Sequence, residues 1–206
     1  MQATRRPHDP TKVCRTEVSA FSWQLVWSCV VAMLLLGCGT VASAQEAVWN
    51  AVRSGAVVLF RHADAPGVGD PQGFKLDDCA TQRNLGPAGR EQARKLGERL
   101  RAQGVRPARV LTSQWCRARD TAELAFPGQA EASPAFNSFF DDRARDTAQT
   151  AEARALLLAW RGPGALVVFT HQVNISALSG ITAQSGEGVV LQRQGDALLV
   201  TGRIAP

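Results

Sequence analysis

The sequence is poor in metal-binding residues and has no strong charge imbalance. Its 206 residues include three histidines and five cysteines, and none of them has the spacing of metal ligands. The formal net charge is +5, and it falls to +3 without residues 1–44, which carry four basic and two acidic side chains. So mild a charge argues against nucleic acid as a partner. The chain also lacks internal repeats and low-complexity linkers, so nothing divides residues 45–206, which are enough for one domain.

The first 44 residues have the pattern of a secretory signal peptide. A basic segment containing Arg5 and Arg6 precedes an apolar run over residues 25–37, and Ala42-Ser43-Ala44 is a small-residue cleavage site. The apolar run is short for a membrane span. We therefore expect cleavage after Ala44 and a periplasmic or secreted domain over residues 45–206. The alternative is a lipoprotein, because the sequence LLGC ends at Cys38 and resembles a lipidation box.

Three short apolar runs alternate with helical patterns in this domain. The runs at 55–60, 108–113 and 164–170 are rich in Val and Leu, as expected of strands covered on both faces. Residues 86–104 and 147–160 have helical spacing. The tail predicts a hairpin, with strands at 187–194 and 197–204. The pattern predicts an α/β fold: a three-layer α/β/α sandwich with a mostly parallel central sheet and an antiparallel edge.

Two further stretches have no regular pattern. Residues 65–82 are rich in Gly, Pro and Asp, and residues 127–146 contain the sequence FNSFFDD. Long irregular segments in compact domains are often functional loops.

Each apolar run ends in residues suited to binding phosphate. Arg61 and His62 follow the first run, Arg117 follows the second, and His171 follows the third. Parallel strands place their carboxyl ends on one edge of the sheet, so these side chains can converge. His62 and His171 are also the only histidines after residue 44.

Arginine and histidine at one site suit phosphoryl chemistry. A guanidinium group offers phosphate oxygens a fixed fork of donors. A neutral imidazole can act as a nucleophile and hold a phosphoryl group covalently. The structural alternative is that Arg61 and Arg117 form salt bridges to Asp64 or Asp120.

Four ordered blocks resemble the histidine phosphatase superfamily, also called phosphoglycerate mutase-like. FRHAD, beginning at Phe60, is similar to its Arg-His-Gly signature, with Ala63 in place of glycine. The other blocks are NLGPAGREQA at 84–93, TSQWCRARDTAEL at 112–124 and VVFTHQVNI at 167–175.

The resemblance implies a role for each matched residue. His62 would be the phosphorylated nucleophile, and Arg61, Arg117 and His171 would bind the phosphoryl group and its transition state. Further residues expected at the substrate are Arg83, Asn84, Asp64 and Gln172.

The chain has no match to the residue that serves as general acid in the family. Many members have a Glu after the second strand, where this chain has Asn137, and others have an Asp after the second histidine, where it has Gln172. Asp141 and Asp142 are the nearest candidates, with a solvated loop pair as the alternative. The short RHADA form and the missing acid are similar to the small phosphohistidine phosphatases.

The sequence thus predicts an exported phosphatase that hydrolyses a small phosphorylated substrate through phosphohistidine, without metal or cofactor. The alternative is a non-catalytic module that binds a phosphorylated ligand in the same fold. We also expect Cys79 and Cys116, the only cysteines after residue 44, to form a disulfide beside the site, since an exported chain meets an oxidising compartment. Two small buried thiols are the alternative.

Overall fold

The computed structural model describes residues 43–206 and begins with a helix over residues 43–53. The predicted signal peptide lies outside the described residues, except for its last two positions, and so does the alternative lipid anchor at Cys38. No helix within residues 43–206 is both long enough and apolar enough to cross a membrane.

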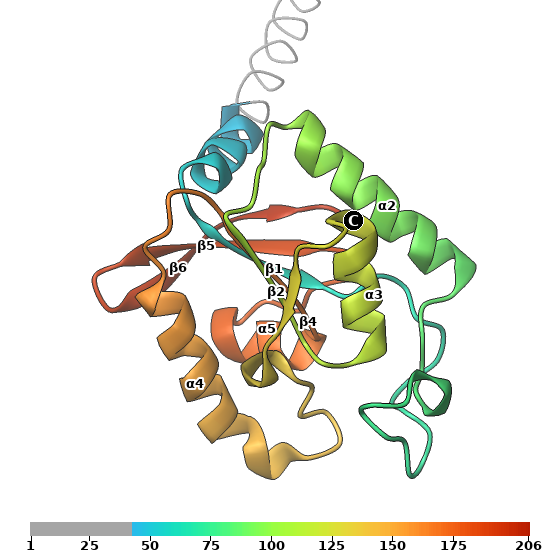
Figure 1. Ribbon diagram of the computed structural model, residues 1–206. Coiled ribbons are helices and arrows are strands. Elements are labelled where there is room, and N and C mark those ends of the chain that lie inside the picture. The colour runs from blue at the N-terminus through green and yellow to red at the C-terminus, as the bar shows by residue number, and fades with distance from the viewer. Residues whose placement is uncertain (1–42) are drawn as a thin grey trace, which may run out of the picture. The chain divides into compact units, whose positions relative to one another are not determined.

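A six-stranded sheet forms the centre of the domain, in the order β3-β2-β4-β1-β5-β6 (Figure 1). Its strands are β1 (Val57–Arg61), β2 (Arg109–Thr112), β3 (Ala130–Ala132), β4 (Leu166–Thr170), β5 (Gly188–Gln194) and β6 (Ala197–Ile204). The first four strands pair in parallel, whereas β5 pairs antiparallel with both β1 and β6. The mostly parallel sheet and its antiparallel edge are therefore confirmed.

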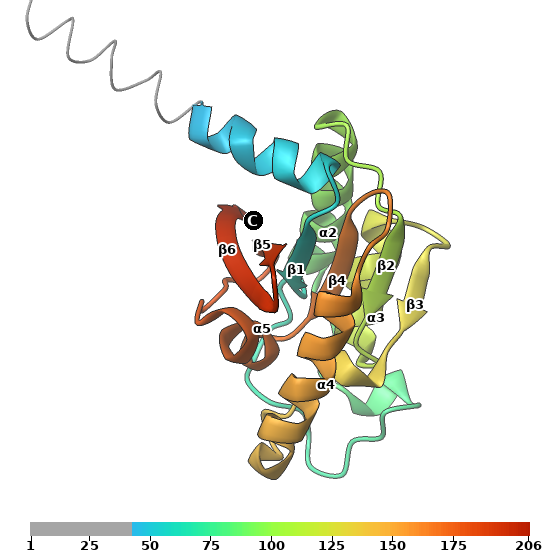
Figure 2. The same cartoon turned by 90° about the vertical axis from the view of Figure 1, so that its left-hand side faces the viewer.

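Helices cover both faces of the sheet. They are α2 (Pro87–Ala102), α3 (Cys116–Ala125), α4 (Asp146–Ala159) and α5 (Gln172–Ser179). Figure 2 shows the strands side by side, with α4 in front of the sheet and α2 and α3 behind it, and α5 packs on the same face as α4. Three short 3-10 turns complete the chain: η1 (Cys79–Thr81), η2 (Pro134–Phe136) and η3 (Arg143–Arg145). The three-layer prediction is confirmed.

Strand β4 shows why the central strands are apolar at every position. Val167 and Phe169 pack into one core with α2, α3 and the helix over residues 43–53. Leu166 and Val168 pack into the second core with α4 and α5. All five residues of β4 are buried, because successive side chains point to opposite faces and both faces are covered.

Two glycines bring α2 close to its neighbours. A Cβ at Gly89 would lie 1.9 Å from the carbonyl oxygen of Asp64, and a Cβ at Gly97 would lie 2.3 Å from that of Ala125. The helix ends as expected, since Gly104 follows the C-cap residue with φ +71°. The start of α2 therefore packs directly against the chain that follows β1.

Candidate active site

Hydrogen bonds between adjacent strand ends bring the predicted site together. The backbone N–H of His62, just after β1, donates to Thr170 at the end of β4 at 2.9 Å. The backbone N–H of Ser113, just after β2, donates to Phe169 at 2.9 Å. The carboxyl ends of β1, β2 and β4 therefore lie at one edge of the sheet, as the sequence predicts.

A pocket of about 160 Å³ opens at this edge. The predicted site residues that line it are Arg61, His62, Arg83, Arg117, Asp141, His171 and Gln172. Three other predicted residues do not line it, namely Asp64, Asn84 and Asp142. Asp64 and Asp142 are exposed, and the Asn84 amide donates to the carbonyl oxygens of Cys79 and Gln82 at 2.6 and 3.1 Å.

His62 is buried and held in one orientation. Its Nδ1 lies 2.8 Å from the carbonyl oxygen of Ala63, and a carbonyl accepts only, so Nδ1 carries the proton. Its Nε2 is therefore the acceptor, and it takes a hydrogen bond from Nε of Arg117 at 3.2 Å. Burial, followed by the charge of Arg117, lowers the pKa of His62 to about 3. The ring is neutral near pH 7 and has a lone pair on Nε2.

Arg117 lies in the first turn of α3, and its side chain is only 3% exposed. Its Nη1 donates to both carboxylate oxygens of Asp70, at 2.8 and 3.0 Å. Burial lowers the pKa of Arg117, but the hydrogen bonds and charge of Asp70 oppose this effect. Arg117 does form a salt bridge, but its partner is Asp70 and not the predicted Asp64 or Asp120. Asp120 pairs with Arg90.

His171 caps the start of α5 and faces His62, with 5.4 Å between the ring centroids. Its Nε2 lies 2.8 Å from the hydroxyl oxygen of Ser113, which leaves Nδ1 available to a ligand. Burial is the main cause that lowers the pKa of His171 well below its ordinary value, and the charge of His62 adds to it. The indole of Trp115 packs edge-on against this ring, at 5.5 Å.

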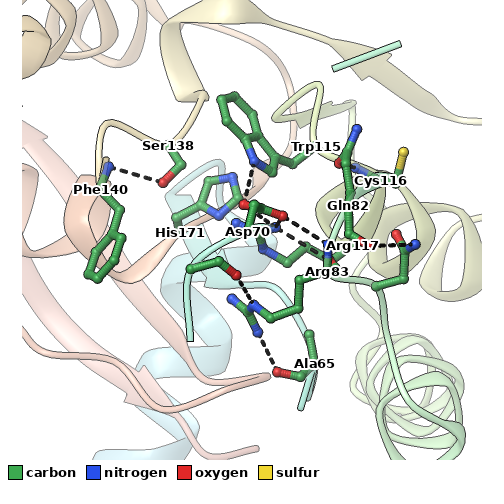
Figure 3. Close-up of polar contacts among 12 residues, drawn as sticks. Ala65, Asp70, Gln82, Arg83, Trp115, Cys116, Arg117, Ser138, Phe140 and His171 are labelled. Carbon is green, nitrogen blue, oxygen red and sulfur yellow. Dashed lines mark hydrogen bonds and ion pairs between the residues drawn. The ribbon is translucent and has the colours of Figure 1, made fainter. Parts of the chain in front are cut away.

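Two more guanidinium groups complete the basic lining. Arg61 donates from Nη1 to the carbonyl oxygen of Ala183 at 3.0 Å, and its buried Nε has no partner among residues 43–206. Burial and the charge of Arg83 lower the pKa of Arg61. Arg83 donates from Nε to the carbonyl oxygen of Gly69 at 2.7 Å and from Nη1 to that of Ala65 (Figure 3). No Arg61 ion pair occurs within the described residues, so its unpartnered Nε remains available to an anion.

Asp70 and Ser113 are among the residues of the site that the sequence did not predict. Asp70 lines the pocket, while Ser113 orients His171. Asn137, at the position expected for the general acid, is buried and bonded to Ser113 and to Gln114. Its amide stabilises the loop and does not line the pocket.

Cys79 and Cys116 form the predicted disulfide, with 5.7 Å between their Cα atoms. The bond joins η1 to the first residue of α3, immediately before Arg117. Next to it, the backbone N–H of Cys116 donates to Oε1 of Gln82 at 3.0 Å. The loop that carries Asp70 and Arg83 is therefore tied to the helix that carries Arg117.

Comparison with known proteins agrees with this geometry. Residues 57–137 match the model of the histidine phosphatase superfamily (branch 1). This match supports the predicted resemblance to the histidine phosphatase superfamily. A search of curated protein sequences found no significant match.

Solved structures of several phosphatases have a similar fold. The protein histidine phosphatase SixA complexed with tungstate is 21% identical, with a TM-score of 0.54, and the match covers 73% of this chain and 97% of SixA. The alpha-ribazole phosphatase from Shigella flexneri is 16% identical, with a TM-score of 0.53 and coverage of 70% and 94%. A mycobacterial glucosyl-3-phosphoglycerate phosphatase is 20% identical, with a TM-score of 0.51 and coverage of 70% and 93%. At these identities the likeness establishes the fold alone.

Proposed function

We propose that this chain hydrolyses phosphomonoesters through a covalent phosphohistidine at His62. The observation that carries the proposal is the state of that ring. Its Nδ1–H is fixed by the carbonyl oxygen of Ala63, and burial keeps it neutral, so Nε2 has a lone pair in a pocket lined by three arginines. A neutral imidazole surrounded by guanidinium groups suits attack on an anionic phosphoryl group.

The reaction proceeds in two displacements at phosphorus. Nε2 of His62 attacks, the P–O bond to the ester oxygen breaks, and that oxygen leaves with the electron pair and takes up a proton. Water then attacks the phosphohistidine and loses a proton, and the P–N bond breaks to release phosphate and restore Nε2. Arg61 and Arg117 stabilise the charge on the phosphoryl oxygens in both steps. Neither step requires a metal ion.

Asp141 is the proposed proton donor to the leaving oxygen. It lines the pocket, whereas Asp142 does not. Asp70 also lines the pocket, but the hydrogen bond from Arg117 is the main cause that lowers its pKa, against the opposing effect of burial. A carboxylate held ionised in this way is a poor acid, so the donor role falls to Asp141.

The rim of the pocket favours a leaving group with an apolar surface. Val68 and Phe140 both line the pocket and are 87% and 45% exposed. They come from the two irregular stretches noted in the sequence, which meet where Gly69 approaches Asp141. Isolated exposed apolar side chains are common, but a pair beside a phosphate pocket offers a contact surface for the alcohol portion of a substrate.

We further propose that the enzyme acts outside the cytoplasm. The signal-peptide pattern of residues 1–44 and the Cys79–Cys116 disulfide support an oxidising compartment, where such a bond persists. The substrate would then be a small phosphorylated molecule of the cell envelope or its surroundings.

The test is His62→Ala combined with trapping of the phosphoenzyme. Removing the nucleophile is expected to lower kcat on an aryl phosphate by about a thousandfold or more. Brief incubation of the wild type with a ³²P-labelled substrate should give a label that is lost in acid and kept in base. An unchanged melting temperature shows that the variant is folded.

Two outcomes would refute the proposal. Full activity in the variant would exclude His62 as the nucleophile. Phosphate binding without turnover of any aryl phosphate by the wild type would favour a non-catalytic binding module.

A further inference from the structure

Asp70 is the most heavily bonded carboxylate of the pocket, and its role is not explained by the mechanism above. Both of its oxygens accept from Nη1 of Arg117, at 2.8 and 3.0 Å. It also accepts from the backbone N–H of Arg83 at 2.9 Å and from the indole N–H of Trp115 at 3.0 Å. Figure 3 shows Asp70 between Trp115 and Arg117. Four hydrogen bonds from three residues fix one carboxylate.

The ion pair between Asp70 and Arg117 is withdrawn from solvent. Their side chains are 2% and 3% exposed, in contrast to the other arginine–carboxylate pairs within residues 43–206, each of which has at least one solvent-exposed partner. A buried pair costs desolvation on both partners and is retained only when its geometry is well satisfied. A surface contact would not need such an arrangement, so we infer that this ion pair serves the function of the pocket.

The positive charges of the pocket explain why a buried carboxylate is placed beside Arg117. Its lining contains three guanidinium groups, from Arg61, Arg83 and Arg117, while both histidines are neutral near pH 7. Without Asp70 these groups would repel one another in the absence of substrate and would bind phosphate strongly. With Asp70 one of the three charges is already neutralised.

Arg117 also divides its donors between Asp70 and the remainder of the pocket. Nη1 is occupied by Asp70, and Nε donates to Nε2 of His62 at 3.2 Å. Nη2 makes no hydrogen bond with any residue in the described part of the chain. A phosphoryl group can therefore bind Nη2 while Asp70 retains Nη1, so the two anions share one guanidinium.

We propose that Asp70 is a positioning residue that fixes Arg117 and weakens the binding of the phosphate product, so that phosphate leaves after each turnover. Asp70 contributes no atom to bond making or breaking. This inference rests on the proposed phosphate-binding role of the pocket.

The test is the affinity for inorganic phosphate, measured by isothermal titration calorimetry. Asp70→Asn keeps the size of the side chain and removes its charge. The dissociation constant for phosphate is expected to fall by about tenfold, equivalent to ~1.4 kcal/mol. In turnover of an aryl phosphate, KM and the phosphate inhibition constant should fall together, and kcat should not rise. A purely structural role would weaken phosphate binding instead.

Two matched variants isolate the cause. Asp120→Asn makes the same change at an arginine-paired carboxylate on α3, the helix that carries Arg117, but outside the pocket. This variant should leave the phosphate dissociation constant within about twofold of the wild-type value. Asp70→Glu retains the charge and should bind phosphate nearly as weakly as the wild type. Equal tightening in the Glu and Asn variants would show that charge is not the cause and would overturn the proposal, as would unchanged or weaker binding in Asp70→Asn.

If Asp70→Asn does not fold, crystal structures of the wild type without and with vanadate test the proposal. Asp70 should contact Nη1 of Arg117 in both states, with the oxyanion on the other edge of the guanidinium. Separation of Asp70 from Arg117 in either state would overturn the inference. A protein that binds phosphate without hydrolysing esters would refute the proposed function, while the phosphate affinities would still decide the role of Asp70.

Discussion

Reduction of the Cys79–Cys116 disulfide should both destabilise the domain and impair its phosphate pocket. The bond closes a loop with a sequence separation of 37 residues, which includes α2 and β2. For a loop of this length the chain-entropy model gives about 4 kcal/mol of stabilisation at 25 °C. In a domain of this size, that loss corresponds to a fall in Tm of about 8–16 °C.

The local effect follows from the position of the bond. Cys116 directly precedes Arg117, and the loop held by Cys79 carries Asp70 and Arg83. Release of the bond frees this loop from α3 and loosens the arginines relative to each other. The affinity for phosphate should therefore fall on reduction, in addition to the loss of stability.

The assay compares three proteins by calorimetry: the oxidised wild type, the reduced wild type and the double variant Cys79→Ala/Cys116→Ala. Thiol counting on unfolded protein establishes the redox state of each. The reduced wild type and the double variant should show a similar fall in Tm, because both lack the cross-link. Only the double variant also lacks the sulfur atoms, so a similar fall would assign the effect to the cross-link. A fully reduced wild type that melts within about 2 °C of the oxidised protein would refute the reasoning.

Three further predictions concern the site and its support. Arg117→Lys keeps the charge but loses the planar fork, so kcat/KM should fall by about tenfold or more and vanadate inhibition should weaken; unchanged kinetics would contradict the bidentate role. Burial, and then neighbouring charge, lower the pKa values of His62 and His171, so between pH 6.5 and 5 the unfolded chain binds more protons than the folded one. Stability should therefore fall as the pH drops through this window, by up to about 1.4 kcal/mol per pH unit for each histidine, and a Tm independent of pH would contradict the assignment. Gly89→Ala places a Cβ 1.9 Å from a backbone carbonyl two residues after His62, and should cost about 1–3 kcal/mol in chemical denaturation, whereas Glu91→Ala on the exposed side of α2 should cost less than about 0.5 kcal/mol.

The central strands could be predicted because their environment leaves a clear pattern. β1, β2 and β4 are covered on both faces and therefore read as short apolar runs. Strand β3 (Ala130–Ala132) was not predicted, because its sequence AEA has little strand preference and it forms by pairing with β2 at the sheet edge. Helices α3 and α5 were also not predicted as helices. Each is short, and they begin four residues after the end of β2 and two residues after the end of β4, respectively.

The site could be predicted wherever a residue follows a strand. His62, Arg117 and His171 converge because parallel strands end at one edge of the sheet. Asp70 could not be predicted in this way, since its place depends on the path of an irregular loop that is fixed by its own hydrogen bonds and by the disulfide. The Gly-Pro-Asp composition of that loop indicated a functional segment without indicating which carboxylate enters the pocket.

The strand order also determines when the site can assemble during folding. β1, which delivers His62, lies between β4 and β5, and both of these neighbours come from the last third of the chain. A growing chain therefore carries the nucleophile on a strand with two open edges until the C-terminal part has been made, and such edges favour intermolecular pairing. Cys79 and Cys116 both precede β4, so their cross-link can close while the sheet is still incomplete. The loop and α3 can be joined first, whereas the pairing of β1 with β4 and β5 has a high contact order and is expected to be the slow step.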